Sequence, residues 1–369
     1  MSSAPQPPAF VPTIASYETH TMGLSLKPYL DMKVHHLTPS RTWSEIEVIG
    51  RHIRSPPAII FDKEKNDKPF NTQRPTATIL PSNKLVINCF PGADYVRHYA
   101  NILATHLSLS NKDPHIVTIT PPAEKAASQI YLASNLRGLA TDAPNLIIVG
   151  SIPSSTLLSH APWHDAHTPH ELFAWQTTTQ PHGLKVAILH CRASFWGDLA
   201  GDLVQCLRDI CGARLQCVIY VGKLGALSRA HAPNLSLATG QRSWVDGAWV
   251  DWANPIPDRF LRGVARGVHY TSASVLDEDA RWLARNRAEF DWVDPEIGHM
   301  AVAGREAGVR FGYLHLVSNA LEGGFEFDLG NEREGVVVQN RLRMNGWIER
   351  ILKEFIADLD GKFGAGVWE

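Results

Sequence analysis

The segment WVDPEIGHMAVAG, residues 292–304, places Asp294 and Glu296 around a proline at the start of an apolar stretch. Asp, Pro and Glu in this order are typical of a helix start, with Asp294 as the N-cap and Glu296 in the first turn, where the helix dipole favours an anion. A carboxylate at the mouth of a buried segment can also accept hydrogen bonds from a bound polar ligand. The segment alone is compatible with both roles.

Two strand ends carry further polar groups. The run VIYVGKLGALS, residues 218–228, leads a strand into Gly222-Lys223-Leu224-Gly225, and FGYLHLVSN ends at Ser318-Asn319. A Gly-x-x-Gly turn lets backbone N–H groups approach an anion or a sugar, although the same pattern also makes an ordinary tight turn. Asn319 cannot act as a general acid, but its amide can pair with the edge of a base; otherwise it is a turn residue.

Composition excludes several classes of function. The chain has 369 residues, 44% of them hydrophobic, with 35 Lys+Arg against 37 Asp+Glu. This balance offers no basic surface for nucleic acid and no polybasic tract for a membrane, and no apolar run approaches the ~20 residues that span a bilayer. The N-terminus has no secretory pattern, and the five cysteines, odd in number and without a CxxC pair, suit buried thiols in a reducing, cytoplasmic location. The 17 histidines show no HExxH-like spacing, so we predict no metal site.

The pattern along the chain predicts an α/β protein. Residues 1–80 are predicted to be extended and partly irregular, and residues 81–143 to form an additional α/β unit. Buried-strand patterns and helical patterns then alternate, with strands at 84–90, 115–120, 145–151, 183–191, 215–227 and 310–318 and a long final helix. Continuous apolar strands between helices indicate a central twisted, mixed or parallel sheet flanked by helices. Ligands of such sheets collect beyond the carboxyl ends of the strands.

The order of these motifs resembles the nucleoside phosphorylase superfamily. The match runs through VIYVGKLGALS, LATG (237–240), VDPEIGHMAVAG and FGYLHLVSN, and it assigns residues 144–369 to a catalytic domain with an extra N-terminal region. Glu296 stands at the second Glu of the family's sugar-binding segment, where Asp294 replaces the first. Asn319 stands where an acid is usual, Tyr220 at the usual Arg, and Lys223 at the usual Thr or Ser.

The resemblance implies cleavage of the N-glycosidic bond of a purine-type nucleoside or nucleotide, by water or by phosphate. It implies that Glu296 holds the sugar, Asn319 the leaving base, and Lys223 with the Gly222–Gly225 loop the nucleophile. It places further substrate contacts at Asp294, Met300, Ser318, His269, Tyr270 and Arg192. His269 and Tyr270 are alternatively packed residues, and Arg192 a solvated surface residue.

The role of Lys223 distinguishes cleavage by phosphate from cleavage by water. Lys223 either binds phosphate as a point charge or fills the phosphate pocket, paired to an acid such as Asp198 or Glu296. The second arrangement is favoured, because a lysine is a poor substitute for the absent bidentate arginine at Tyr220. No cofactor is expected apart from phosphate as a co-substrate.

The resemblance also implies a small-molecule substrate and a homo-oligomer, with no nucleic-acid or membrane partner. Two other functions remain compatible with the substituted family positions. One is a repurposed enzyme that acts on a non-nucleoside substrate in specialised metabolism, and the other is a non-catalytic nucleoside-binding module.

Overall fold

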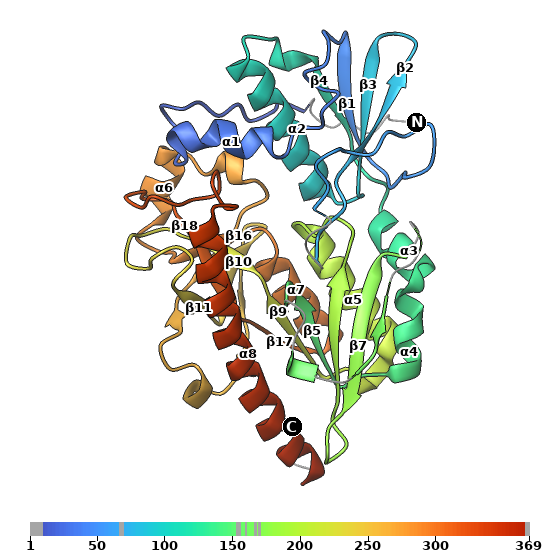
Figure 1. Ribbon diagram of the computed structural model, residues 1–369, viewed down its shortest axis with the longest axis vertical. Coiled ribbons are helices and arrows are strands. Elements are labelled where there is room, and N and C mark those ends of the chain that lie inside the picture. Colours follow the sequence, from blue (N-terminus) through green and yellow to red (C-terminus); the bar gives the residue numbers. More distant parts are fainter. Residues whose placement is uncertain are drawn as a thin grey trace, which may run out of the picture.

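The computed structural model describes residues 10–65, 70–152, 156–158, 161–165, 168 and 171–365, and it arranges them around three β-sheets (Figure 1). A smaller α/β unit from the N-terminal third lies at one end of the molecule, and two larger sheets with their helices form the rest. The observed class is α/β with mixed sheets flanked by helices, as predicted. All five cysteines are buried and none forms a disulfide. Within the described residues, no helix has the length and apolar character to cross a membrane.

The N-terminal sheet has the strand order β2-β3-β1-β4. Its elements are β1 (Glu45–Gly50), β2 (Thr76–Leu80), β3 (Lys84–Cys89), β4 (Val117–Thr120), and the helices α1 (Leu26–Asp31) and α2 (Ala93–Leu109). β1 is parallel to β3 and β4, while β2 forms an antiparallel pair with β3. The boundary predicted at residue 80 therefore divides a sheet, because β1 and β2 come from the segment expected to be irregular. Residues 1–9 and 66–69 of that segment lie outside the described residues.

The six-stranded sheet has the order β17-β9-β5-β8-β7-β6. Its strands are β17 (Arg310–Tyr313), β9 (Cys217–Val221), β5 (Leu146–Gly150), β8 (Lys185–Cys191), β7 (Phe173–Thr179) and β6 (Trp163–His164). The first four are parallel, and β7 and β6 continue the sheet in antiparallel pairs. Its nearly continuous apolar strands are buried on both faces, which is why their sequences do not alternate.

Helices cover the two faces of this sheet separately. Alternate β5 side chains pack into different apolar clusters, Ile147 and Val149 with one set of helices, and Leu146 and Ile148 with the other. The first set comprises α3 (Ala126–Ala133), α4 (Leu139–Asp142), α5 (Asp198–Cys211) and α7 (Ile297–Ala307). The long helix α8 (Gly335–Gly364) covers the second face.

Two strands pass from the six-stranded sheet into the eight-stranded sheet. The runs predicted as single strands at 215–227 and 310–318 are broken at Gly222 and Leu314, so that β9 continues as β10 (Lys223–Ala226) and β17 as β18 (His315–Ala320). A Cβ on Gly222 would lie 2.9 Å from His315 Nε2 and 3.0 Å from the Tyr220 ring, so only glycine fits at this break. The polar strand-end residues are thereby carried beyond the first sheet and into the second.

The eight-stranded sheet has the order β13-β12-β15-β16-β10-β18-β11-β14. Its other strands are β11 (Leu237–Thr239), β12 (Arg242–Val245), β13 (Ala248–Asp251), β14 (Ala265–Arg266), β15 (His269–Thr271) and β16 (Trp292–Asp294). The short helix α6 (Ala280–Asn286) lies between β15 and β16 along the chain. β10 pairs with β16 on one side and with β18 on the other, which brings the 292–296, 222–226 and 315–320 segments together.

A charged cluster joins the N-terminal unit to the core where α2 and α5 begin. Asp198 accepts from the backbone N of Ala93 at 2.7 Å, and Asp94 accepts from the backbone N of Asp198 at 3.2 Å. His299 of α7 reaches Asp94 with its Nε2 3.0 Å from Oδ2. Burial and the charge of Asp94 raise the pKa of Asp198 to about 6. Burial lowers the pKa of His299, but the bond and charge of Asp94 outweigh it and the net shift is upward.

The variant His299→Gln tests this junction. Because the folded-state pKa of His299 lies above its ordinary 6.5, its ion pair stabilises the fold fully below pH 6.5 and loses this contribution as pH rises through the folded pKa. We expect a loss of about 2 kcal/mol at pH 6 and a smaller one at pH 9, measured by urea unfolding. Asp246→Asn is the control, since that carboxylate is 81% exposed and 3.8 Å from His299. An equal loss at both pH values would contradict the assignment.

Candidate active site

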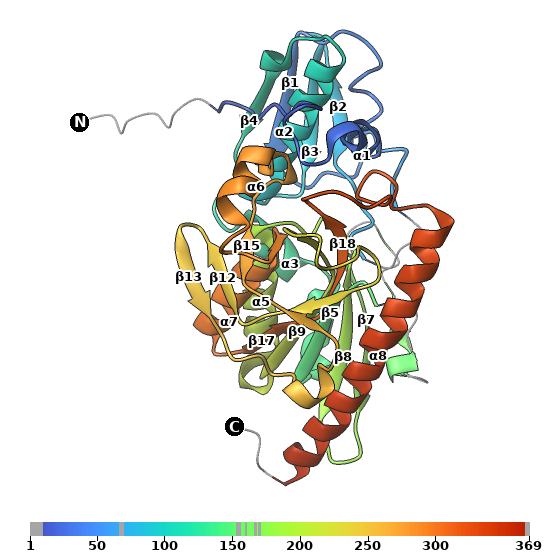
Figure 2. The same ribbon diagram turned by 90° about the vertical axis from the view of Figure 1, so that its left-hand side faces the viewer.

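A cavity of about 690 Å³ lies where the N-terminal unit, the two crossing strands and the start of α8 meet. Figure 2 shows β18 and the upper end of α8 next to α1 and the four-stranded sheet. The core supplies a wall at 220–225 and 293–296 and at Leu316, Ser318 and Asn319, with Phe195, Trp196, Val275 and Glu278 beside it. The N-terminal segment supplies Tyr29, Lys33, Glu64, Lys65, Phe70, Asn71 and Arg74, and the C-terminal segment supplies Leu329, Glu332, Arg333, Val338, Arg341, Leu342 and Asn345.

Asp294 performs the capping that its sequence position predicts. It ends β16, and its Oδ1 accepts from the backbone N–H groups of Glu296 and Ile297, both at 2.9 Å. The same carboxylate lies 3.0 Å from His269 Nε2 and 3.4 Å from His315 Nε2. Burial acts to raise the pKa of Asp294, but the two histidines outweigh it and hold the pKa below its usual range.

Because Asp294 caps the helix, the side chain of Glu296 does not have to do so. Glu296 occupies the N-cap position of α7 rather than the first turn, and its side chain makes no capping hydrogen bond. Its carboxyl group lines the cavity and hydrogen-bonds to the Tyr220 hydroxyl. Burial, together with the negative charge of Asp294, raises the pKa of Glu296 well above 4.5. Asp294 thus caps the helix and Glu296 faces the cavity, whereas the sequence left both roles open for one carboxylate.

Neighbouring carboxyls with pKa values moved in opposite directions are typical of acid–base sites. Asp294 remains ionised, while Glu296 keeps a proton to higher pH and can donate it or share it with a hydroxyl group. Glu278 lines the same cavity, and burial followed by the charge of Asp277 raises its pKa well above 4.5. Glu278 was not predicted, although it follows the candidates His269 and Tyr270 by fewer than ten residues along the chain.

The strand-end residues face the same cavity. Ser318 donates through its Oγ to the Leu224 carbonyl at 3.0 Å and to Asn319 Oδ1 at 2.8 Å. Those contacts fix the Asn319 amide, whose Nδ2 has no acceptor among the described residues. Gly222 and Gly225 line the cavity beside it, with a bulge between Leu224 and Gly225 in the pairing with β18. This arrangement can present an amide N–H and peptide groups to a heterocyclic base or a sugar.

Lys223 is paired with a different acid from either one predicted. Its Nζ lies 2.7 Å from Glu332 Oε2, whereas Asp198 caps the junction at α2 and Glu296 bonds to Tyr220. Glu332 lies 109 residues further along the chain, in the segment before α8, so no local spacing pointed to it. Lys65 and Arg341 contact the same carboxylate at 2.9 and 3.2 Å.

Four predicted contacts lie away from the cavity wall formed by the described residues. Met300 is fully buried in the α7 core, and His269 is fully buried behind Asp294, where its Nδ1 meets Ser243 Oγ at 2.8 Å. Tyr270 packs edge-on against Trp282 and Phe290. Arg192 is half-buried after β8, and its backbone bonds to Gln73 and Leu172. His269 can act on the site only through Asp294.

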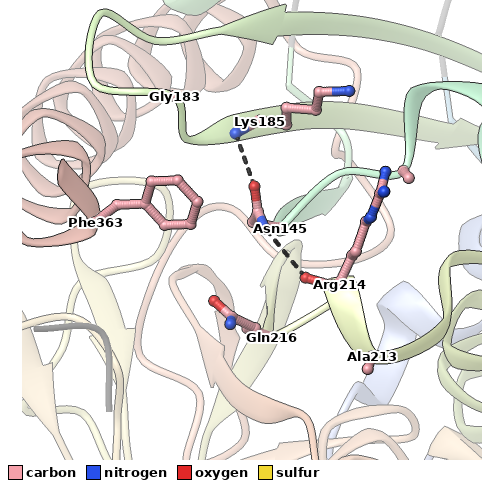
Figure 3. Close-up of a pocket in the computed structure, with 8 residues that line it drawn as sticks. Asn145, Gly183, Lys185, Ala213, Arg214, Gln216 and Phe363 are labelled. Carbon is pink, nitrogen blue, oxygen red and sulfur yellow. Dashed lines mark hydrogen bonds between the residues drawn. The ribbon is translucent and has the colours of Figure 1, made fainter. Parts of the chain in front are cut away.

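A second cavity, of about 460 Å³, lies at the opposite ends of β5, β8 and β9 (Figure 3). Asn145 spans it, accepting from the Lys185 backbone N at 3.0 Å and donating to the Arg214 carbonyl at 3.3 Å. These bonds tie neighbouring strand starts together, and the wall holds no carboxylate. The chemical groups are therefore concentrated in the first cavity. In the described part of the chain, no three His, Cys, Asp or Glu side chains gather as metal ligands.

Comparisons with known proteins give partial likenesses. No protein-family model matches the chain. A curated relative, Oxidoreductase cns1 of Cordyceps militaris, is 23% identical over 303 residues, covering 76% of this chain and 36% of that protein. The chain thus spans about a third of that relative's length.

Several solved structures are similar to part of the chain. A P. knowlesi homologue of P. falciparum PNP is 13% identical with a TM-score of 0.45, covering 60% of this chain and 92% of that one. Uridine phosphorylase from Vibrio fischeri is 13% identical with a TM-score of 0.46, covering 58% and 91%. The 5′-methylthioadenosine/S-adenosyl homocysteine nucleosidase of Campylobacter jejuni is 12% identical with a TM-score of 0.44, covering 57% and 99%. These proteins belong to the class that the sequence motifs resemble, and each is similar to this chain over only part of its fold.

The variants Asp294→Asn and Glu296→Gln are expected to affect stability in opposite ways. Removing the Asp294 charge leaves two buried histidines without their carboxylate, which costs about 3 kcal/mol. A folded-state pKa raised above 4.5 means that ionising Glu296 destabilises the fold as pH rises from 4.5 toward the folded pKa. Glu296→Gln removes that cost, so it is neutral near pH 5 and stabilising at pH 8 in thermal unfolding. A large loss of stability in Glu296→Gln at pH 8 would restore a capping role.

Proposed function

We propose that the protein cleaves the N-glycosidic bond of a purine-type nucleoside or nucleotide. The observation that carries this proposal is a pair of neighbouring buried carboxyls, Glu296 with a raised pKa and Asp294 with a lowered pKa, in a cavity that also presents the amide of Asn319. In the reaction the electron pair of the C–N bond goes to the base nitrogen, and positive charge develops on the sugar. A nucleophile adds at the sugar carbon, and the base gains a proton.

Each part of this reaction has a group in the cavity. Glu296 hydrogen-bonds the sugar hydroxyls, and the nearby negative charge of Asp294 supports the developing cation. Asn319, held by Ser318, binds the edge of the leaving base. Asn319 has no acidic proton, so the proton for the base comes from one of the two carboxyls with raised pKa, Glu278 or Glu296. The water that adds to the sugar carbon returns a proton to the carboxylate so formed, which restores the carboxyl.

Water is the nucleophile that we favour. The Lys223 ammonium is already engaged by Glu332 at 2.7 Å, and Tyr220 occupies the position at which the family resemblance expects an arginine. The aromatic side chains Tyr29, Phe70, Phe195 and Trp196 line the same cavity and suit a flat heterocycle. Trp196 is fixed by stacking on His98, with the ring centroids 4.0 Å apart, and by donating from its Nε1 to the Ala273 carbonyl.

The first activity test is a panel of purine nucleosides and nucleotides, with and without phosphate, scored for released base and pentose. We expect release without phosphate, and Glu296→Gln to lower turnover by ~10²–10³ while the protein remains folded. Glu289→Gln is the control, because Glu289 is an exposed acid outside the cavity. Binding without release by the wild-type chain would indicate a nucleoside-binding module. Neither binding nor release would indicate an enzyme repurposed for a non-nucleoside substrate.

The second test is Lys223→Ala, which separates water from phosphate as the nucleophile. If Lys223 fills the nucleophile site, its removal opens space there, and we expect phosphate to begin to accelerate base release. Lys353→Ala, which removes a surface lysine paired to Glu349 within α8, should leave the response to phosphate unchanged. A wild-type enzyme that turns over nucleosides only when phosphate is supplied, and loses this turnover in Lys223→Ala, would identify a phosphorylase instead.

A further inference from the structure

The cavity is lined by six cations, and the proposed reaction gives a place only to Lys223. Three come from the N-terminal segment, two from the C-terminal segment and one from β10: Lys33, Lys65, Arg74, Arg333, Arg341 and Lys223. A neutral nucleoside needs none of these charges. The N-terminal and C-terminal segments, which lie outside the crossing strands, supply most of these cations to the same cavity.

The acidic residues of the cavity are already engaged or buried. Glu332 is 7% exposed and is shared by Lys65, Lys223 and Arg341. Glu64 is engaged by Arg54 at 2.5 Å, and Asp294 is paired with two histidines behind the wall. Burial favours the neutral form of Glu278 and Glu296. In the described part of the chain, the wall arginines Arg74 and Arg333 form no ion pair with a carboxylate.

Arg74 is a buried cation with an unsatisfied hydrogen-bond donor. It is 9% exposed, and its guanidinium donates to Asn71 Oδ1 at 3.1 Å. Its buried Nε finds no acceptor in the described part of the chain, and the same is true of Nη2 of Arg341. A buried guanidinium N–H without an acceptor costs free energy, and a planar fork of this kind suits the oxygens of a phosphate group.

We propose that Arg74, Arg333 and Arg341, with Lys65, bind a phosphate monoester of the substrate, so that the ligand is a purine nucleoside 5′-monophosphate. The 5′ position follows because the 2′- and 3′-hydroxyls are assigned to Glu296. The identity of the sugar and base rests on the proposed function, whereas the phosphate subsite rests on the cationic wall itself. The N-terminal segment then has a function in the site: it supplies Arg74, Lys65 and Lys33.

Binding is measured by calorimetry on the full chain with a ligand pair that cannot be cleaved, a carbon-linked purine nucleoside analogue and its 5′-monophosphate. We expect the monophosphate to bind at least about 10-fold more tightly, with an affinity that falls as salt is added. Arg74→Gln should reduce this preference by about 10- to 100-fold, since charge-assisted hydrogen bonds are lost. Arg333→Gln should also reduce it, and this exposed residue can be replaced without disturbing the core.

Lys63→Gln is the matched control, because Lys63 is an exposed cation of the same segment that does not line the cavity and should not change the preference. Equal affinity for the two ligands, or a preference unchanged by both arginine variants, would overturn the subsite. Orthophosphate that binds alone, and tightens rather than competes with the unphosphorylated analogue, would assign the cations to a co-substrate and overturn the monophosphate proposal. Tight monophosphate binding with no base release from true nucleotides would keep the subsite and remove the cleavage proposal.

Discussion

The carboxylate of Asp294 is the contact on which the site depends. It ends β16, accepts the N–H groups of Glu296 and Ile297 at the start of α7, and meets one histidine from β15 and one from β18. Three strands and a helix are thus fixed around a single buried charge. A buried charge is tolerated only when it is well paired, so any change to these partners is costly. Its charge also acts at a distance, because it favours the protonated forms of Glu296 and Glu278.

The position of that carboxylate depends in turn on the two crossing strands. β10 lies between β16 and β18, and both long strands change sheets beside each other, at Gly222 and Leu314. The Gly222 N–H donates to His315 Nδ1 at 3.2 Å, so the break in one strand also orients the histidine that contacts Asp294. Tyr220 lies two residues before Gly222, and its hydroxyl group hydrogen-bonds to Glu296. Backbone geometry and acid–base chemistry are therefore coupled through a few residues.

Local pattern predicted much of this fold, because it depends on local signals. The strands predicted at 84–90, 145–151 and 183–191 form within a residue or two of their predicted limits. The breaks at 222 and 314 were not predicted, since an apolar run looks the same whether it stays in one sheet or passes into another. Glu332 and Arg74 were missed because they reach the cavity from distant segments and carry no motif. His269 was assigned to the pocket by its neighbourhood, whereas its side chain lies one layer behind, on Asp294.

The distribution of charge in the cavity follows from how the chain is assembled. The acids with raised pKa values, Glu296 and Glu278, belong to the core, where burial makes ionisation costly. Most of the cations belong to the segments before and after that core. A protonated carboxyl needs water to be kept away, while a cationic wall needs a counter-charge. A ligand with a polar sugar at one end and an anion at the other satisfies both conditions at once, since its binding displaces water from the carboxyls and supplies the charge that Glu332 alone does not provide.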